Sequence, residues 1–386
     1  MANSNLTNAK KAKNDEFYTQ YNDIEKEINA YFDYNNQVFR NKTILLPCDD
    51  PEWSNFTKFF AQNFVKLGLK KLISTSFASE SKSYKSDYQP SLFETASPQY
   101  DKTKTEKCGK IFTLTVDKTG DGKTDIEDFD WKYLKGDGDF KSEEIKKLRD
   151  EADIIITNPP FSLFREFLSW IVEADKKFVV VGSKNAITYK ELFPLIKDNK
   201  MWVGTTSFSK DMLFISPEKI DPKEKPNSAT RTIDGIVYLR SPSVWYSNLD
   251  HGRRHQALPL MSMEENLKYS KHKDLQGKTS YDKYDNYDAI EIPFTDSIPS
   301  DYEGVMGVPI SFLDKYSPEQ FDILGNGQTM ADELGIKPVG QKFVDDYYAQ
   351  GNKGQINAKW NNLVYRIGEK AIVPYQRILI KHKKKS

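Results

Sequence analysis

The segment of this sequence with the clearest chemical potential is Asn158-Pro159-Pro160-Phe161, directly after the apolar run 153–157. Two consecutive prolines stiffen the backbone and remove two N–H donors, so the segment presents carbonyl oxygens and one amide as acceptors. Such acceptors suit an amine nucleophile such as adenine N6, because they draw electron density toward the attacking nitrogen. The Phe161 ring offers a flat face on which a planar base can stack. A base in duplex DNA must leave the duplex to reach this ring.

The same four residues could instead form a strand-to-helix turn that simply ends at the two prolines. Their position favours a functional interpretation, because a continuous apolar strand is typical of a parallel sheet covered on both faces. Ligands of open α/β sheets bind beyond the carboxyl ends of such strands. We therefore interpret Asn158, Pro159, Pro160 and Phe161 as candidate catalytic residues.

A doubly wound α/β sheet is the fold that would position this segment. Apolar patterning predicts strands at 43–47, 70–78, 153–157, 176–183 and 201–205. Helices are predicted at 15–32, 56–67, 142–150, 163–174 and 189–199. Strand, helix and strand over 43–78 predict a parallel βαβ unit. Residues 110–117 alternate like an exposed strand, and beyond about 250 the sequence becomes irregular, rich in Tyr, Asp, Pro and Gly.

Composition excludes several classes of protein. The 386 residues contain no apolar run of about 18, so no transmembrane helix is expected, and the N-terminus lacks the apolar region of a signal peptide. Cys48 and Cys108 cannot form a disulfide framework, which indicates a reducing cytoplasm. Two cysteines and only four histidines also argue against a zinc site. The 56 basic and 56 acidic residues exclude a globally basic surface but not a local one that binds nucleic acid.

Several blocks of the sequence resemble the EcoRI-type adenine-specific DNA methyltransferases, and Asn158–Phe161 looks like the catalytic motif of amino-methyltransferases. The blocks are DEFYTQYNDIE (15–25), CDDPEWSNF (48–56), KGDGDF (135–140), TNPPFSLFREF (157–167), YDNYDAI (284–290), GVMGVPISFLDKYSPEQF (304–321) and RILIKHK (377–383). They cover most of the chain. The resemblance implies a Rossmann-like fold that transfers a methyl group from S-adenosylmethionine (AdoMet) to N6 of an extruded adenine, by direct in-line attack and without a metal.

The patterning along the chain also predicts a division into parts. A flexible arm over 1–14 precedes an AdoMet-binding catalytic domain over 15–250, which carries a polar insertion at about 79–130. Residues 251–386 then form an irregular α+β region for target recognition that ends in a C-terminal strand.

The family match suggests contacts to the methyl donor near the N-terminus and after the first strand. Phe17 and Tyr18 match a segment whose aromatic side chain lies near the methionine part of AdoMet, although an ordinary helix start is an alternative. Asp49 and Asp50 follow the first strand, where a carboxylate can accept hydrogen bonds from the donor's ammonium or hydroxyl groups. The Gly-rich turn usual there is absent, as in the EcoRI type, and capping by Asp50 or Ser54 is the alternative.

Two more segments match the family. Asp139 and Phe140 correspond to the segment that holds the adenine of AdoMet, with an ordinary tight turn as the alternative. Trp245 and Tyr246 resemble an aromatic segment that packs against the extruded target adenine, with core packing as the rival interpretation.

Weaker patterns concern DNA and calcium. Arg253 and Arg254, flanked by His251 and His255, form a basic cluster for phosphates or base edges, or a solvated loop. The loop 117–128 partly matches EF-hand spacing, but position twelve is Asp128 rather than Glu, so we expect a solvated turn.

The resemblance implies a monomer that acts on double-stranded DNA, with GAATTC as the candidate site and a restriction endonuclease of the same specificity as the candidate partner. Two other functions stay open. Methyltransferases of an RNA base or a protein glutamine use similar Asn-Pro-Pro-aromatic loops, and a non-catalytic DNA-binding specificity protein could retain the fold.

Overall fold

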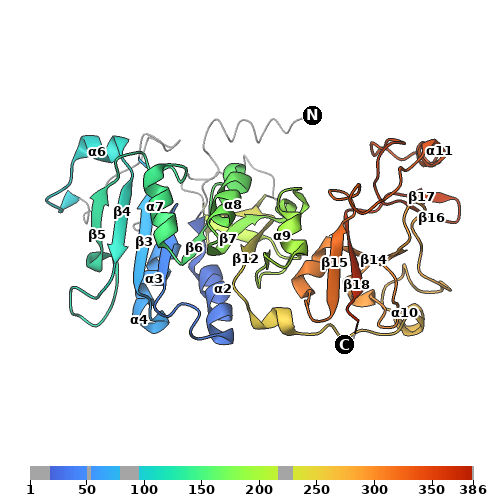
Figure 1. Cartoon of the computed structure of the whole chain (residues 1–386), viewed down its shortest axis with the longest axis horizontal. Coiled ribbons are helices and arrows are strands. Elements are labelled where there is room, and N and C mark those ends of the chain that lie inside the picture. The colour runs from blue at the N-terminus through green and yellow to red at the C-terminus, as the bar shows by residue number, and fades with distance from the viewer. Residues whose placement is uncertain (1–17, 50–53, 79–94, 216–228, 385–386) are drawn as a thin grey trace. The chain divides into compact units, whose positions relative to one another are not determined.

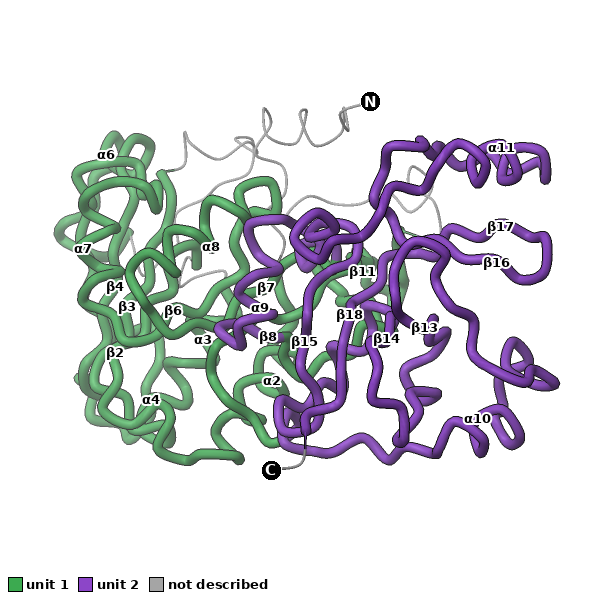
Figure 2. Tube along the Cα trace, turned by 45° about the vertical axis from the view of Figure 1, so that its right-hand side comes forward, with its two compact units in different colours: residues 1–184, 203–252 green, residues 185–202, 253–386 purple. Residues whose placement is uncertain are grey.

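The computed structural model describes residues 18–49, 54–78, 95–215 and 229–384. They divide into two compact units, the first formed by residues 1–184 and 203–252 and the second by 185–202 and 253–386 (Figure 2). Segment 185–202, which the sequence placed in the catalytic domain, joins the second unit because its helix α9 (Phe193–Lys197) packs against strand β15 (Phe321–Asn326). Within the described ranges, no helix has the length and apolar character needed to cross a membrane.

The first unit is built on an eight-stranded sheet in the order β5-β4-β3-β2-β6-β7-β12-β8 (Figure 1). Its centre is parallel and consists of β3 (Lys71–Ser76), β2 (Thr43–Leu46), β6 (Ile154–Thr157) and β7 (Lys177–Ser183). Antiparallel strands extend it: β4 (Lys110–Leu114), β5 (Asp130–Tyr133) and, beside β7, β12 (Ser243–Ser247). The short strand β8 (Trp202–Val203) is the last on that side. The predicted α/β sheet and its parallel βαβ unit are confirmed.

One sequence expectation about the sheet was wrong, and one strand was missed. The strand at 110–117 was expected to be exposed, yet four of its five residues in β4 are buried, because β4 lies between β3 and β5. Strand β5 was not predicted, since Trp131 is its only buried residue and its sequence therefore carries little apolar signal.

The helices of the first unit follow the predicted order with shifted ends. They are α2 (Tyr21–Tyr34), α3 (Asn55–Gln62), α4 (Phe64–Leu67), α6 (Lys102–Lys107), α7 (Glu143–Glu151) and α8 (Phe164–Glu173). The helix expected over 56–67 is interrupted at Asn63, whose side chain donates to the Phe59 carbonyl. The helix expected from residue 15 begins only at Tyr21, after a short strand. The helix expected at 189–199 is reduced to α9, which carries Pro194 in its first turn.

A second, antiparallel sheet in the first unit has the order β1-β9-β11-β10, and the sequence did not predict it. Its strands are β1 (Tyr18–Thr19), β9 (Met212–Ile215), β11 (Ile236–Ser241) and β10 (Thr230–Ile233). Thr19 is paired with Phe214. This pairing brings the start of the described chain beside β9.

The second unit is irregular, as expected, around a four-stranded sheet in the order β13-β14-β18-β15. Besides β15, its strands are β13 (Ile290–Glu291), β14 (Met306–Pro309), β18 (Arg377–His382), and the separate pair β16 (Tyr365–Ile367) and β17 (Lys370–Ile372). Its longer helices are α10 (Met263–Tyr269) and α11 (Gln341–Ala349). Short 3-10 helices of both units lie at Ile126–Asp128, Phe161–Leu163, Lys184–Thr188, Gly252–His255, Thr295–Ser297 and Ile310–Lys315.

Candidate active site

The carboxyl ends of three parallel strands meet at one edge of the large sheet in the first unit. Leu45 of β2 is paired with Ile155 of β6, and Leu46 is paired with Ser74 of β3. This register places the segments that follow the strands next to one another. Asp49 follows β2, and Asn158 follows β6.

The Asp49 carboxylate joins two of these strand ends. It is only 6% exposed and accepts hydrogen bonds from Ser54 Oγ and Thr157 Oγ1, each at 2.6 Å. Ser54 also accepts from the Phe56 N–H at 3.1 Å and caps helix α3, so its predicted alternative role as a cap is confirmed. Because Thr157 directly precedes Asn158, this bond fixes the backbone on which Asn158 stands.

The backbone of Asp49 is tied to the sheet as well. Its carbonyl accepts from Thr57 Oγ1 at 3.1 Å and from the hydroxyl of Ser74 on β3. The side chains of Thr57, Ser74 and Thr157 are all buried. The sequence singled out Asp49 but missed these hydroxyl partners, whose one visible signal is that Thr157 ends an apolar strand.

The remaining candidates around the N-terminus and first strand are only partly described. Phe17 and Asp50 lie outside the described residues. Tyr18 belongs to β1, but its side chain is outside the description. A cofactor contact for any of these residues stays a prediction.

The Asn-Pro-Pro-Phe segment lies at the rim of the core. Pro159 is buried, whereas Asn158, Pro160 and Phe161 are half-buried. The Phe161 ring meets Phe214 of β9 edge-on, with centroids 6.2 Å apart and planes at 80°. The sequence did not identify Phe214, although it belongs to the apolar run 212–215.

The loop that carries Asp139 is fixed to the end of β3. The Ala78 N–H donates to the Asp137 carbonyl at 2.8 Å. Gly138 has φ +93°, and a Cβ there would lie 2.5 Å from the Ser76 carbonyl oxygen, so only glycine permits this approach. Asp139 is half-buried, and its carboxylate accepts from the Lys141 N–H at 2.8 Å.

The predicted aromatic stacking residues are inside the protein. Phe140 is 1% exposed and lies edge-on to Phe167 and Trp170 of α8, with centroids 5.1 and 5.6 Å away. Trp245 and Tyr246 on β12 are fully buried. Core packing, the rival interpretation for this pair, accounts for both rings: Trp245 contacts Phe56, and Tyr246 contacts Phe164 and donates to the Ser183 carbonyl.

The predicted basic cluster is not a solvated loop. Arg254 is 6% exposed, lies over the Trp202 ring with its guanidinium carbon 3.6 Å from the centroid, and donates to Asn199. Arg253 is half-buried. His255 pairs with Glu319 at 2.7 Å. DNA contacts by Arg253 and Arg254 stay predictions.

The loop 117–128 is organised by its own carboxylates. Asp117 accepts from the Gly120 and Gly122 N–H groups at 2.7 and 2.9 Å. Asp128 accepts from the N–H groups of Lys118 and Asp125 at 2.8 and 3.0 Å. Two residues of the calcium-like pattern therefore stabilise the turn itself.

Comparisons with known proteins identify the family of the chain. The family described as Adenine-specific methyltransferase EcoRI matches residues 5–383. The Type II methyltransferase M.EcoRI of Escherichia coli is 40% identical over 83% of this chain and 89% of its own length. The type II methyltransferases M.MgeORF184P of Mycoplasma genitalium and M.MpnI of Mycoplasma pneumoniae are 35% and 33% identical, each over 82% of this chain and over 84% and 83% of their own lengths. No solved structure matches the chain.

Proposed function

We propose that this chain, which belongs to the EcoRI family of adenine-specific DNA methyltransferases, holds its target adenine against Asn158–Phe161 at the sheet edge. The observation that carries the proposal is the bond from Thr157 to Asp49, because it fixes Asn158 beside the end of β2. When bound, the donor of this class, AdoMet, supplies a methyl group already activated by its sulfonium.

The side chains at this edge of the sheet have chemical groups suited to binding AdoMet. Asp49 and Asp139 offer carboxylate oxygens to ammonium, amino and hydroxyl groups, and an oxygen that accepts one hydrogen bond keeps a second lone pair. Phe17, Tyr18 and Asp50 complete the proposed donor site. Phe140 belongs to it as a support, since its ring packs against α8 beneath the Asp139 loop.

In the proposed reaction, the Asn158 side-chain oxygen and the Pro159 carbonyl accept hydrogen bonds from the N6 amine of the adenine. As the bond from nitrogen to the methyl carbon forms, the bond from that carbon to the donor's sulfur would break, and N6 would then lose one proton to solvent. These fixed acceptors stabilise the positive charge that develops on nitrogen during attack. Phe161 lies against the base, and Phe214 steadies its ring. Orientation supplies much of the rate, because the methyl group needs no further activation by a protein nucleophile or a metal.

Residues farther from this edge receive different roles. We assign no base contact to Trp245 and Tyr246, because both are fully buried. Arg253 remains our candidate for a phosphate contact. Arg254 would orient it through the stack on Trp202.

The biological setting is part of the same proposal. The enzyme would act as a monomer in the cytoplasm and protect DNA from a restriction endonuclease of the same specificity. GAATTC is the candidate site implied by the resemblance to the EcoRI type.

The deciding experiment follows labelled methyl transfer from AdoMet to mixed-sequence duplex DNA, to RNA and to protein. We expect incorporation into duplex DNA and a loss of at least about 100-fold in turnover for Asn158→Ala, with AdoMet binding by calorimetry retained. Asn36→Ala, at an exposed asparagine after α2, is the matched control. Turnover of Asn158→Ala like that of the wild type, or transfer only to RNA or protein, would refute the proposal.

A further inference from the structure

Lys184 directly follows β7, the strand beside β6 in the large sheet of the first unit (Figure 1). Its side chain is only 13% exposed. The ammonium donates to the carbonyls of Phe208 and Lys210 at 2.6 and 2.9 Å, and it donates to the Asp211 carboxylate at 3.1 Å. Because an ammonium carries three donors, segment 204–211 accepts from all of them.

The start of segment 204–211 is held by a buried carboxylate. Glu27 of α2 is 1% exposed and accepts from the N–H and the hydroxyl of Thr205 at 2.9 and 2.6 Å. Tyr31 donates to the same carboxylate at 2.8 Å. A Cβ at Gly204 would overlap this carboxylate, so the close approach requires glycine. The segment is therefore anchored at its start by Glu27 and at its end by Lys184.

Segment 204–211 leads directly into β9, which contacts the candidate catalytic segment. Asp211 precedes the first residue of β9, and Phe214 of β9 packs edge-on against the Phe161 ring. Phe214 is fully buried. A shift in the position at which β9 begins would therefore move the side chain that supports Phe161.

Lys184 also holds the junction between the two sheets of the first unit. Its N–H donates to the Pro242 carbonyl at 2.7 Å, and Pro242 links β11 of the small antiparallel sheet to β12 of the large sheet. The small sheet carries Phe214, whereas Phe161 follows β6 of the large sheet. The backbone and the side chain of Lys184 thus join the two sheets that carry these rings.

Two simpler roles for Lys184 fit the contacts less well. A surface ion pair contributes little, and Asp211 already pairs with Arg240 at 3.0 Å. Two of the three bonds from the Lys184 ammonium go to main-chain carbonyls, which fix the backbone rather than balance a charge. A contact to a DNA phosphate would need donors that are still available, whereas those of Lys184 are engaged within the protein.

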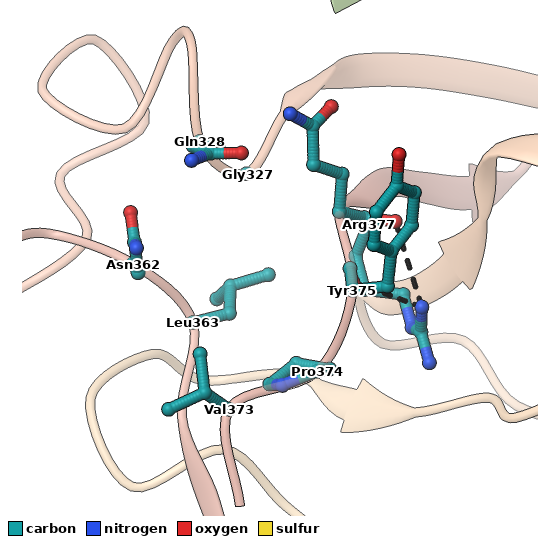
Figure 3. A pocket seen from close by; sticks show the side chains of 9 residues that line it. Gly327, Gln328, Asn362, Leu363, Val373, Pro374, Tyr375 and Arg377 are labelled. Atoms are coloured by element: carbon teal, nitrogen blue, oxygen red, sulfur yellow. Dashed lines mark hydrogen bonds between the residues drawn. The ribbon is translucent and has the colours of Figure 1, made fainter. Parts of the chain in front are cut away.

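A cation in the second unit, at the pocket of about 300 Å³ shown in Figure 3, provides a contrast. The Arg377 guanidinium donates to the carbonyl of Tyr375, two residues earlier in the chain, at 2.9 Å, and it also pairs with Glu291. The carbonyl bonds of Lys184 span 24 and 26 residues. They therefore fix the backbone of a distant segment, which a bond across two residues cannot do.

We propose that Lys184 is a positioning residue for the methyl transfer. It fixes the start of β9, so that Phe214 holds the Phe161 ring in place against the target base. The inference rests on the proposed function, because it assumes that Phe161 lies against that base. In-line transfer is sensitive to such placement, since a displacement of about 1 Å can lower the rate about 100-fold.

The test compares Lys184→Met with the wild type in methyl transfer to duplex DNA. The single-turnover rate should fall by about 10- to 100-fold. The affinities for AdoMet and for DNA should stay unchanged, because Lys184 binds neither of them in this proposal. Arg240→Met is the matched control, since it removes the other cation bound to Asp211 with the same change in charge. It leaves the bonds from Lys184 to the two carbonyls intact, so its rate should remain that of the wild type.

A double variant tests whether Lys184 acts through Phe161. Phe161→Leu removes the ring that Phe214 supports. Adding Lys184→Met to this variant should cause little further loss, so the combined loss should be smaller than the product of the two single losses. A merely structural role would give independent effects, whose fold-changes multiply.

Lys184→Gln is a second variant in case Lys184→Met does not fold, as judged by circular dichroism. Its amide keeps two of the three donors. Its rate should fall by less than that of Lys184→Met, with the same affinities and the same non-additivity with Phe161→Leu.

The outcomes separate the two proposals. No methylation of duplex DNA by the wild type would overturn the proposed function. Methylation by the wild type with an unchanged rate in the Lys184 variants would overturn the inference alone. An equal loss in Arg240→Met would assign the effect to charge, and losses that multiply in the double variant would assign it to the fold in general; either result rejects the positioning role. A loss confined to AdoMet affinity would place Lys184 in the donor site and reject it too.

Discussion

Two polar clusters, one in each unit, differ in how their buried groups are bonded. In the first unit, the hydroxyl groups of Ser54 and Thr157 both donate to the buried Asp49 carboxylate. In the second unit, Thr329 and Gln376 each hold a buried atom without a partner among the described residues. The first cluster is bonded internally, whereas the second contains buried polar atoms that the described residues leave unpaired.

The difference shows that burial alone does not reveal a polar residue's role. A buried group with a hydrogen-bond partner stabilises the fold, whereas a buried group without one lowers stability. The same kind of substitution should therefore have opposite consequences in the two clusters.

The largest effect on stability is expected for Arg377→Ala, which removes one partner of the ion pair between Arg377 and the buried Glu291. Loss of the guanidinium leaves Glu291, 2% exposed, as an uncompensated buried charge, so the free energy of unfolding should fall by about 3–5 kcal/mol. Urea-induced unfolding measures this fall in the free energy of unfolding. Arg377→Lys, which keeps the charge, should lose less, and equal losses would contradict this explanation.

The next largest effect is expected for Thr157→Val, which keeps the shape of the side chain but removes its hydroxyl. The Asp49 carboxylate then loses a buried donor, and the free energy of unfolding should fall by about 1–3 kcal/mol. Turnover should fall too, because Asn158 loses its fixed neighbour. A variant with an unchanged urea midpoint and an unchanged kcat would show that this hydrogen bond neither stabilises the fold nor positions Asn158.

The same substitution at the second cluster, Thr329→Val, is expected to change the free energy of unfolding by less than about 0.5 kcal/mol, or to increase it. Its hydroxyl has no partner among the described residues, so no bond is lost. Comparing the free energy of unfolding of Thr157→Val with that of Thr329→Val therefore measures the difference between the two clusters. A loss above about 1 kcal/mol at Thr329 would show that its hydroxyl is bonded in the free protein.

The smallest effect concerns pH. Burial by itself would raise the pKa of Asp128, but the N–H groups of Asp125, Thr119 and Lys118 donate to its carboxylate and lower that pKa below its usual range. Its contribution to stability is therefore complete above the unfolded pKa, about 4, and is lost as pH falls through the folded pKa. The difference in unfolding free energy between wild type and Asp128→Asn should shrink toward zero below about pH 4, and a constant difference would contradict the pKa direction.

The sequence predicted the parallel strands and the position of Asn158 because both signals are local. An apolar run such as 154–156 encodes a buried strand, and two prolines encode its end. The strands of the antiparallel sheet β1-β9-β11-β10 were missed, because they are short and partly exposed and owe their stability to pairing with distant segments.

The sequence by itself therefore determined the fold class, the family and the segment Asn158–Phe161. Only the tertiary structure decided which polar groups are paired, because Asp49 and Thr157 are 108 residues apart. It also decided that Phe140 and Trp245 pack inside the protein.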